Sequence, residues 1–101
     1  MRLRHPNIVC VAGMYRRKGI ADLLHVFALV REQSVHEREF LPEPHLYLVG
    51  DGPDRDSMEA LAADLGTASS MHFTGFVADA RPYFAGADVF ARSRARIRRR
   101  S

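Results

Sequence analysis

The sequence predicts an α/β fold built on a parallel β-sheet of about four strands with flanking helices. Three observations support this fold class. Short apolar runs alternate with segments of helical periodicity, a glycine follows each of the first three runs, and the connections are short. Alternation of this kind gives parallel strands joined by right-handed crossovers. We therefore expect the order β-α-β-α-β-α-β in a Rossmann-like sheet.

The first strand and the first helix are predicted within the first third of the chain. Residues 7–12 are short, rich in β-branched side chains and followed by Gly13, as expected for a buried strand. From Gly19 the apolar residues repeat at the spacing of one helix face, and the helix is expected to end near residues 32–33. That face consists of Ile20, Leu23, Leu24, Phe27 and Ala28. The polar residues 34–44, with two prolines, predict a loop.

The second strand is predicted over residues 45–49, and a glycine-rich turn follows it. Pro53 suits the first position of a helix, with Gly52 as its cap. Gly66 is expected to end that helix. Its buried stripe is Met58, Leu61, Ala62 and Leu65.

The remaining elements are shorter. Residues 70–74 predict a third strand that ends at Gly75, residues 79–85 a short helix, and residues 88–91 a fourth strand. A chain of 101 residues is long enough for one small domain, and we assign it to residues 1–91.

The net charge of +3 comes from the end of the chain and not from the domain. Residues 1–91 hold all 12 acidic residues and 9 of the 15 lysines and arginines, whereas residues 92–101 hold six arginines. We expect this arginine-rich tail to be disordered or non-native, because reading GC-rich DNA in a wrong frame produces such a composition. A basic arm can also bind nucleic acid through its charge. The tail lacks the aromatic residues that stack on bases, so nucleic acid is not the expected partner.

Composition argues against several other classes of protein. No apolar run approaches the ~20 residues of a membrane helix, and the amino terminus lacks the apolar core of a signal peptide, so we expect a cytoplasmic location. Cys10 is the single cysteine and lies in an apolar run, which predicts a buried residue. The five histidines show no ligand spacing. We therefore predict no metal site and no cofactor, and we assign no catalytic residue.

The most distinctive segment is the turn between the first strand and the first helix. It runs from Gly13 through Arg16, Arg17 and Lys18 to Gly19. A helix amino terminus favours anions through its free N–H groups and its dipole. Three cations at the carboxyl end of a parallel strand therefore predict a phosphate-bearing ligand. The alternative is a solvated basic loop.

A second glycine-rich turn, residues 50–55, follows the second strand. It occupies the place of a dinucleotide fingerprint, but Arg55 replaces the third glycine and no acidic residue follows the third strand to bind a ribose. NAD binding is therefore disfavoured. Two interpretations stay open, a tight strand-to-helix turn and a turn that lines a nucleotide-sugar cleft. Asp54 and Asp56 are interpreted as partners of the helix dipole and not as metal ligands.

Four segments, in order and at matching spacing, resemble the carboxyl-terminal domain of GT-B glycosyltransferases. The closest group is glycosyltransferase group 1 (family 4), and the resemblance covers residues 8–91. The matching segments are residues 13–19, 46–55, 73–77 and 87–90. That family transfers a sugar from a nucleotide-diphospho-sugar to an acceptor, usually without a metal. Its two Rossmann-like domains face a cleft, and the carboxyl-terminal one binds the donor.

The resemblance implies a diphosphate contact for Lys18 at the start of the first helix. A lysine there can neutralise the charge that develops on a departing nucleoside diphosphate. The family usually has an arginine directly after the first glycine, where this chain has Met14. Arg16 or Arg17 would then supply the missing cation, next to Gly13.

The resemblance also implies a nucleoside contact after the third strand. Backbone groups near Phe76 and Val77 would meet the nucleobase. Gly50 and Gly52 would keep the neighbouring turn tight. The implied binding partner is thus a nucleotide sugar, which is a substrate and not a cofactor.

Parts of a GT-B enzyme are not found in the sequence. The family has a glutamate-bearing loop after the fourth strand and an amino-terminal half-domain that binds the acceptor. We therefore expect an incomplete GT-B domain from a truncated reading frame, with little or no transferase activity of its own. The alternatives are a non-catalytic Rossmann-like nucleotide binder and a nucleic-acid-binding module that uses the basic tail.

Overall fold

The computed structural model describes residues 2–14, 17–37, 42–91 and 97–98, and it confirms the α/β fold class. A five-stranded sheet with strand order β3-β2-β1-β4-β5 forms the centre. The first four strands run parallel, and β5 is antiparallel to β4. The strands are β1 (Asn7–Val11), β2 (His45–Val49), β3 (Met71–Gly75), β4 (Val89–Ala91) and β5 (Ile97–Arg98).

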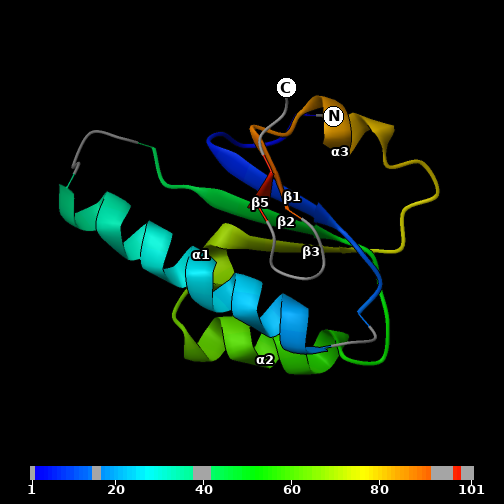
Figure 1. The fold of residues 1–101 in the computed structure, drawn as a ribbon, viewed down its shortest axis with the longest axis horizontal. Coiled ribbons are helices and arrows are strands. Elements are labelled where there is room, and N and C mark those ends of the chain that lie inside the picture. Colours follow the sequence, from blue (N-terminus) through cyan, green and yellow to red (C-terminus); the bar gives the residue numbers. More distant parts are fainter. Residues whose placement is uncertain (1, 15–16, 38–41, 92–96, 99–101) are drawn as a thin grey trace.

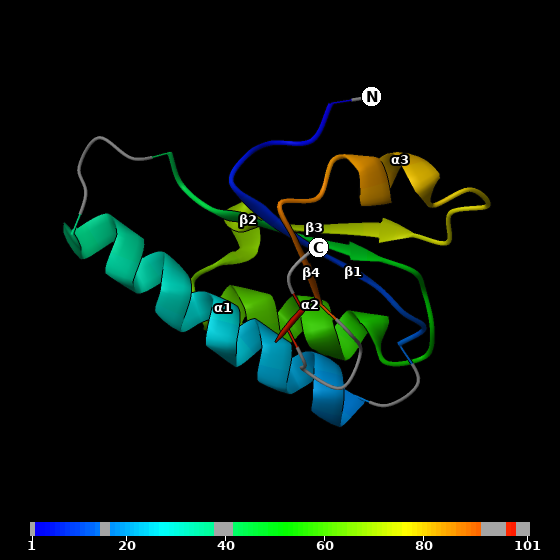
Figure 2. The same cartoon turned by 45° about the horizontal axis from the view of Figure 1, so that its top comes forward.

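Helices cover both faces of this sheet (Figure 1). Helices α1 and α2 lie side by side on one face, whereas α3 lies on the opposite face with the amino-terminal segment (Figures 1 and 2). The sheet is therefore enclosed between two layers, as in a doubly wound fold. The helical elements are α1 (Arg17–Glu37), α2 (Arg55–Asp64), α3 (Arg81–Ala85) and the 3₁₀ turn η1 (Ala68–Ser70).

The larger core lies between the sheet and helices α1 and α2. The predicted face of α1 is turned inward, and Leu24 and Phe27 are fully buried on it. Met58 of α2 joins the same cluster. Strand β2 is buried along its whole length, as is typical of a central parallel strand covered on both faces. The apolar periodicity in the sequence thus identified the correct faces of both helices.

The second face has a smaller core. Val9 and Val49 from the sheet are buried there with Tyr47 and Ala87. Val77 packs against this cluster from the segment that follows β3. Val77 therefore holds the segment directly after β3 to the second face.

Helix α1 is longer than the sequence predicted. It runs from Arg17 to Glu37, whereas the periodicity predicted a start at Gly19 and an end near residues 32–33. Arg31 ties the second half of the helix to neighbouring segments. The groups that accept hydrogen bonds from its guanidinium are Glu43, Ser70 and the Gly66 carbonyl.

Helix α2 begins at Arg55, so the prediction that Pro53 opens it with Gly52 as the cap is wrong. The residue at the cap position is Asp54. Its N–H donates to the carbonyl oxygen of Met14 at 3.0 Å, so the turn is anchored to the β1–α1 connection before the helix starts. A local helix preference is here overridden by a backbone contact between two turns.

Two residues of the tail form a short strand. Strand β5 pairs with β4, so that Ile97 lies opposite Ala91 and Arg98 opposite Phe90. The expectation that residues 92–101 are disordered or non-native stays a prediction. The free side of β4 offers unpaired backbone groups, and the following chain satisfies them. The remaining arginines of the tail lie outside the described residues: Arg92, Arg94, Arg96, Arg99 and Arg100.

A helix that crosses a bilayer needs about 20 mostly apolar residues. Among the helices of the described ranges, none is both long and apolar enough to cross a membrane.

Candidate functional site

The strand order contains a switch point between β1 and β4. From β1 the chain moves outward through β2 to β3, then returns to place β4 on the other side of β1. In open parallel sheets, ligands bind outside the carboxyl ends of the strands at such a point. We call the connections that leave β1, β2 and β3 there the carboxyl edge, which comprises residues 12–14, 50–54 and 75–77.

Backbone hydrogen bonds join the first two connections of the carboxyl edge. The N–H of Ala12 donates to the Val49 carbonyl at 3.0 Å, and that of Met14 donates to the Asp51 carbonyl at 3.1 Å. Met14 is 1% exposed and belongs to the larger core. The position where the family usually has an arginine therefore contributes to packing here and supplies no charge.

Two glycines allow this close approach. A side chain on Gly50 would place its Cβ 2.0 Å from the Ala12 carbonyl oxygen, and Gly50 also has a positive φ of 141°. A Cβ on Gly52 would lie 2.8 Å from backbone atoms of Met14. The turn after β2 is thus tight because the turn after β1 packs directly on it.

The predicted cations lie around the start of α1. Arg17 and Lys18 form its first turn, which contains no acidic residue. Their position at the amino end gives the helix start both free N–H groups and positive charge. Gly13 is exposed just ahead of this turn, and Arg16 lies outside the described residues.

The third connection leaves β3 with an irregular backbone. The pairing of β3 with β2 shifts register between Phe73 and Gly75, which leaves Thr74 as a bulge. Gly75 then takes a positive φ of 76°, and its carbonyl accepts a hydrogen bond from the Gly50 N–H at 3.0 Å. The chain turns outward here, so that Phe76 is 81% exposed while Val77 is partly buried.

Sequence reasoning missed the contribution of Arg55, which it treated only as the replacement of a fingerprint glycine. The Arg55 guanidinium spans the ends of β2 and β3. Nη2 donates to the Phe73 carbonyl at 3.4 Å, and Nη1 lies 3.5 Å from the Asp51 carboxylate. The absence of a glycine at this position was the visible signal, but its partner 18 residues later was not.

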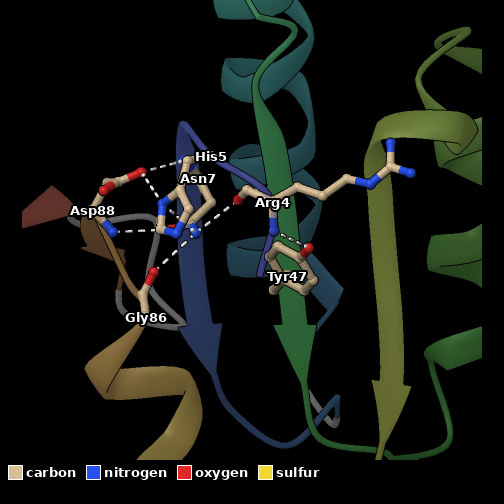
Figure 3. Close-up of polar contacts among 6 residues, drawn as sticks. All are labelled: Arg4, His5, Asn7, Tyr47, Gly86 and Asp88. Atoms are coloured by element: carbon tan, nitrogen blue, oxygen red, sulfur yellow. Dashed lines mark hydrogen bonds and ion pairs between the residues drawn. The ribbon is translucent and has the colours of Figure 1, made fainter. Parts of the chain in front are cut away.

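The opposite ends of the strands, which we call the amino edge, carry a dense polar network (Figure 3). Asn7 is 2% exposed, and its side chain bonds the carbonyls of Arg4 and Gly86 and the N–H of Asp88, each at 2.9 Å. The Asp88 carboxylate also accepts a hydrogen bond from the Asn7 N–H and lies 2.8 Å from His5 Nδ1. The hydrogen bond from His5 lowers the pKa of Asp88 below its usual range.

Two histidines extend the amino edge toward β3. His45 Nδ1 lies 3.0 Å from His72 Nε2, and the His72 ring stacks on Tyr47 with centroids 4.4 Å apart. Burial lowers the pKa of both histidines, and the nearby Arg4 charge lowers it further.

Within the described ranges, no group of three or more His, Cys, Asp or Glu is arranged to hold a metal ion. Burial also raises the pKa of the Cys10 thiol to about 11, which makes it a poor nucleophile.

Fold and strand order together define a Rossmann-like α/β domain, in which the carboxyl edge lies at the switch point of the sheet. A family model described as glycosyl transferases group 1 matches residues 5–95. The chain therefore belongs to this glycosyltransferase family, as the resemblance predicted.

Curated relatives agree with this assignment. The chain is 34% identical over 88 residues to the lipopolysaccharide core biosynthesis glycosyltransferase LpsE of Rhizobium meliloti, covering 87% of this chain and 23% of LpsE. It is also 34% identical over 88 residues to a GDP-mannose-dependent alpha-(1-6)-phosphatidylinositol monomannoside mannosyltransferase of Mycolicibacterium smegmatis, covering 85% and 21% of the two proteins. The chain thus spans about a fifth of the length of the curated relatives it matches.

Solved structures show the same fold. The crystal structure of WaaG, a glycosyltransferase involved in lipopolysaccharide biosynthesis, superposes with a TM-score of 0.67 at 27% identity. The match covers 88% of this chain and 22% of WaaG. The lipopolysaccharide outer core galactosyltransferase WaaB superposes with a TM-score of 0.57 at 16% identity and shows the fold alone.

Proposed function

We propose that this chain forms part of the donor-binding domain of a glycosyltransferase that uses a nucleotide-diphospho-sugar. The observation that carries the proposal is the carboxyl edge. There the cationic first turn of α1, the glycine turn after β2 and the outward exit after β3 lie together at the switch point. A diphosphate at the α1 turn leaves the nucleoside to extend toward Phe76 and Val77.

The proposed chemistry of this edge is electrostatic. Breaking the bond between a sugar and a nucleoside diphosphate leaves negative charge on the departing diphosphate. The N–H groups and the cations Arg17 and Lys18 at the start of α1 stabilise that charge as it develops. In this proposal the nucleotide sugar is a substrate, and neither a metal nor a cofactor takes part.

A complete reaction also needs an acceptor held against the donor. We propose that an acceptor-binding half-domain is the partner of this domain, because orienting two substrates supplies much of the rate enhancement in group transfer. The isolated chain is then expected to bind a donor product without transferring sugar. Saturable sugar transfer by the purified chain would contradict that expectation. The proposed location is the cytoplasm, which fractionation of producing cells tests.

Calorimetric titration tests the proposed site. The chain is titrated separately with UDP, GDP, ADP and inorganic pyrophosphate, and Lys18→Ala is compared with Arg81→Ala. Arg81 is a matched control because it is an exposed cation that pairs with Asp79, and neither residue belongs to the carboxyl edge as defined above. We expect Lys18→Ala to weaken binding of the preferred nucleoside diphosphate about tenfold, as loss of one charge-assisted contact does, and Arg81→Ala to change it little.

Two results would overturn the proposal. One is the absence of binding for every nucleoside diphosphate tested. The other is equal affinity of the original chain and Lys18→Ala, which would remove the α1 turn from the site.

A further inference from the structure

Arg55 connects three segments through one guanidinium group. Nη2 reaches the Phe73 carbonyl of β3 at 3.4 Å, while Nη1 lies 3.5 Å from Asp51 and Nε lies 3.6 Å from Glu59. The two carboxylates lie four residues before and after Arg55, and they hold the guanidinium from both sides. The arginine side chain is 31% exposed, so it is partly screened from water by the ends of β2 and β3.

The exit of β3 is shaped to receive this group. Strand β3 is the last strand on its side of the sheet, so the carbonyls on its outer side have no strand partner. A Cβ on Gly75 would lie 3.1 Å from Arg55 Nη1, which is tighter than ordinary contact. The guanidinium therefore occupies the space that a side chain at position 75 would fill.

These contacts set the path of the chain after β3. The bulge at Thr74, the positive φ of Gly75 and the hydrogen bond from Gly50 turn the backbone outward within two residues. Among the described residues, Arg55 supplies the long side chain whose guanidinium donates to the Phe73 carbonyl of β3, just before this turn. Without it, the Phe73 carbonyl and the space beside Gly75 lose their neighbour, and the exit gains freedom.

We propose that Arg55 is a positioning residue for the nucleoside part of a nucleotide-sugar donor. It touches no substrate in this scheme. It fixes the exit of β3 so that the backbone of Phe76 and Val77 is presented to the base. The inference rests on the proposed function. It adds a residue whose loss should weaken binding of the nucleoside part but not of the diphosphate.

The test compares Arg55→Ala and Arg55→Lys with the control Arg81→Ala in the full chain. Amide hydrogen exchange is measured at Gly50 and residues 73–75 without ligand, and affinities are measured for UDP, GDP, ADP and inorganic pyrophosphate. We expect Arg55→Ala to raise the exchange rate of the Gly50 amide, which donates to the Gly75 carbonyl, about tenfold, because local opening becomes easier. It should weaken the preferred nucleoside diphosphate about fivefold and change pyrophosphate affinity less than about twofold.

Arg55→Lys separates charge from shape. Lysine keeps the charge and most of the stem but loses the planar fork, so we expect intermediate exchange rates and intermediate nucleoside affinity. This variant also keeps the test usable if Arg55→Ala does not fold. The control Arg81→Ala should match the original chain in all measurements.

The outcomes distinguish this inference from the proposed function. Unchanged exchange at Gly50 and residues 73–75 in both Arg55 variants overturns the positioning role, whether or not nucleotides bind. Equal loss of pyrophosphate and nucleoside affinity also overturns it, because Arg55 would then act as a phosphate contact. If exchange changes as expected but the original chain binds no nucleoside diphosphate, the proposed function fails, and the inferred role in nucleoside binding fails with it.

Discussion

The two edges of the sheet are built in opposite ways. The amino edge is closed by side chains, since Asn7 and Asp88 satisfy one another and the backbone groups around them. The carboxyl edge is closed by backbone, because Gly50 and Gly52 let one turn pack directly on another. At the amino edge, a network of side chains holds the strand ends together. At the carboxyl edge, the contacts are between backbone atoms, which leaves N–H groups and surface available to the proposed ligand.

The exposed residues follow the same division. Among the large apolar side chains of the described residues, Phe76 at the carboxyl edge is the most exposed, at 81%. At the amino edge Tyr47 is 7% exposed, and its hydroxyl accepts a hydrogen bond from the Arg4 N–H at 2.8 Å. Side chains hold the amino edge together, and backbone contacts hold the carboxyl edge, where the proposed binding site lies. Substitutions at either edge test this difference.

The largest expected effect is on the carboxyl edge itself. Gly50→Ala places a Cβ 2.0 Å from the Ala12 carbonyl oxygen at a positive φ, so the two turns must separate. We expect a loss of about 4 kcal/mol in the free energy of unfolding, which is enough to unfold a small domain. Urea denaturation followed by circular dichroism measures it.

Gly66 provides the matched control. It also has a positive φ, of 73°, but an added Cβ would meet nothing within 4 Å. Gly66→Ala should therefore cost only the backbone strain, about 1 kcal/mol. Equal losses in the two variants would show that strain, and not the contact between the turns, sets the cost at Gly50.

The next effect is at the amino edge. Asn7→Ala removes the side chain that bonds Arg4, Gly86 and Asp88, and it leaves backbone groups there without partners. We expect a loss of about 2–3 kcal/mol in the free energy of unfolding, again measured by urea denaturation.

Asn7→Ala should have little effect on the proposed binding site. The affinity of the folded fraction for nucleoside diphosphates should stay within about twofold of the original, because the network lies at the opposite ends of the strands. The exposed pair of Arg81 and Asp79 is the control, and Arg81→Ala should leave the free energy of unfolding nearly unchanged. A large loss of affinity in Asn7→Ala would show that the two edges are coupled.

The amino-acid sequence was sufficient for the elements whose signals are local. The strands are apolar runs, and the glycines that follow them mark where the chain leaves the sheet. The buried face of α1 was correct because five side chains repeat at helical spacing. Even the tight turn at Gly50 and Gly52 was expected, although the backbone it packs against was not.

The contacts that define the two edges were not predictable in the same way. Asn7 bonds Asp88, 81 positions later, and no local pattern marks that pair. Arg55 was visible only as a missing glycine. The partners of Arg31, Glu43 and Ser70, lie 12 and 39 positions later, and the pairing of β5 depends on the free side of β4. Each of these depends on which segments the folded chain brings together.

A smaller effect concerns pH at the amino edge. Burial lowers the pKa of His45 and His72 below the ordinary value of 6.5, so the unfolded chain takes up protons first as the pH falls. Stability is therefore expected to decline as the pH drops through that value. The lowered pKa of Asp88 adds a second decline, which begins as the pH falls into the usual carboxyl range and continues below it.

Thermal unfolding between about pH 7.5 and 5.5 isolates the histidine contribution. We expect the midpoint to fall with pH in the original chain and to fall less steeply in His72→Phe, which keeps an aromatic ring against Tyr47. An equally steep decline in the variant would assign the pH dependence to groups other than this pair.

The smallest effect is expected at the most exposed residue of the carboxyl edge. Phe76→Ala should change the free energy of unfolding by less than about 0.5 kcal/mol, whereas Val77→Ala, which removes part of the smaller core, should cost about 1 kcal/mol. Urea denaturation compares the two. If the backbone of these residues meets the base, Phe76→Ala should also leave nucleoside diphosphate affinity within about twofold. A loss of tenfold or more, with stability unchanged, would mean that the Phe76 ring itself stacks on the base. In that case the exposure of Phe76 would serve binding directly, and the carboxyl edge would contribute a side chain as well as backbone to the proposed site.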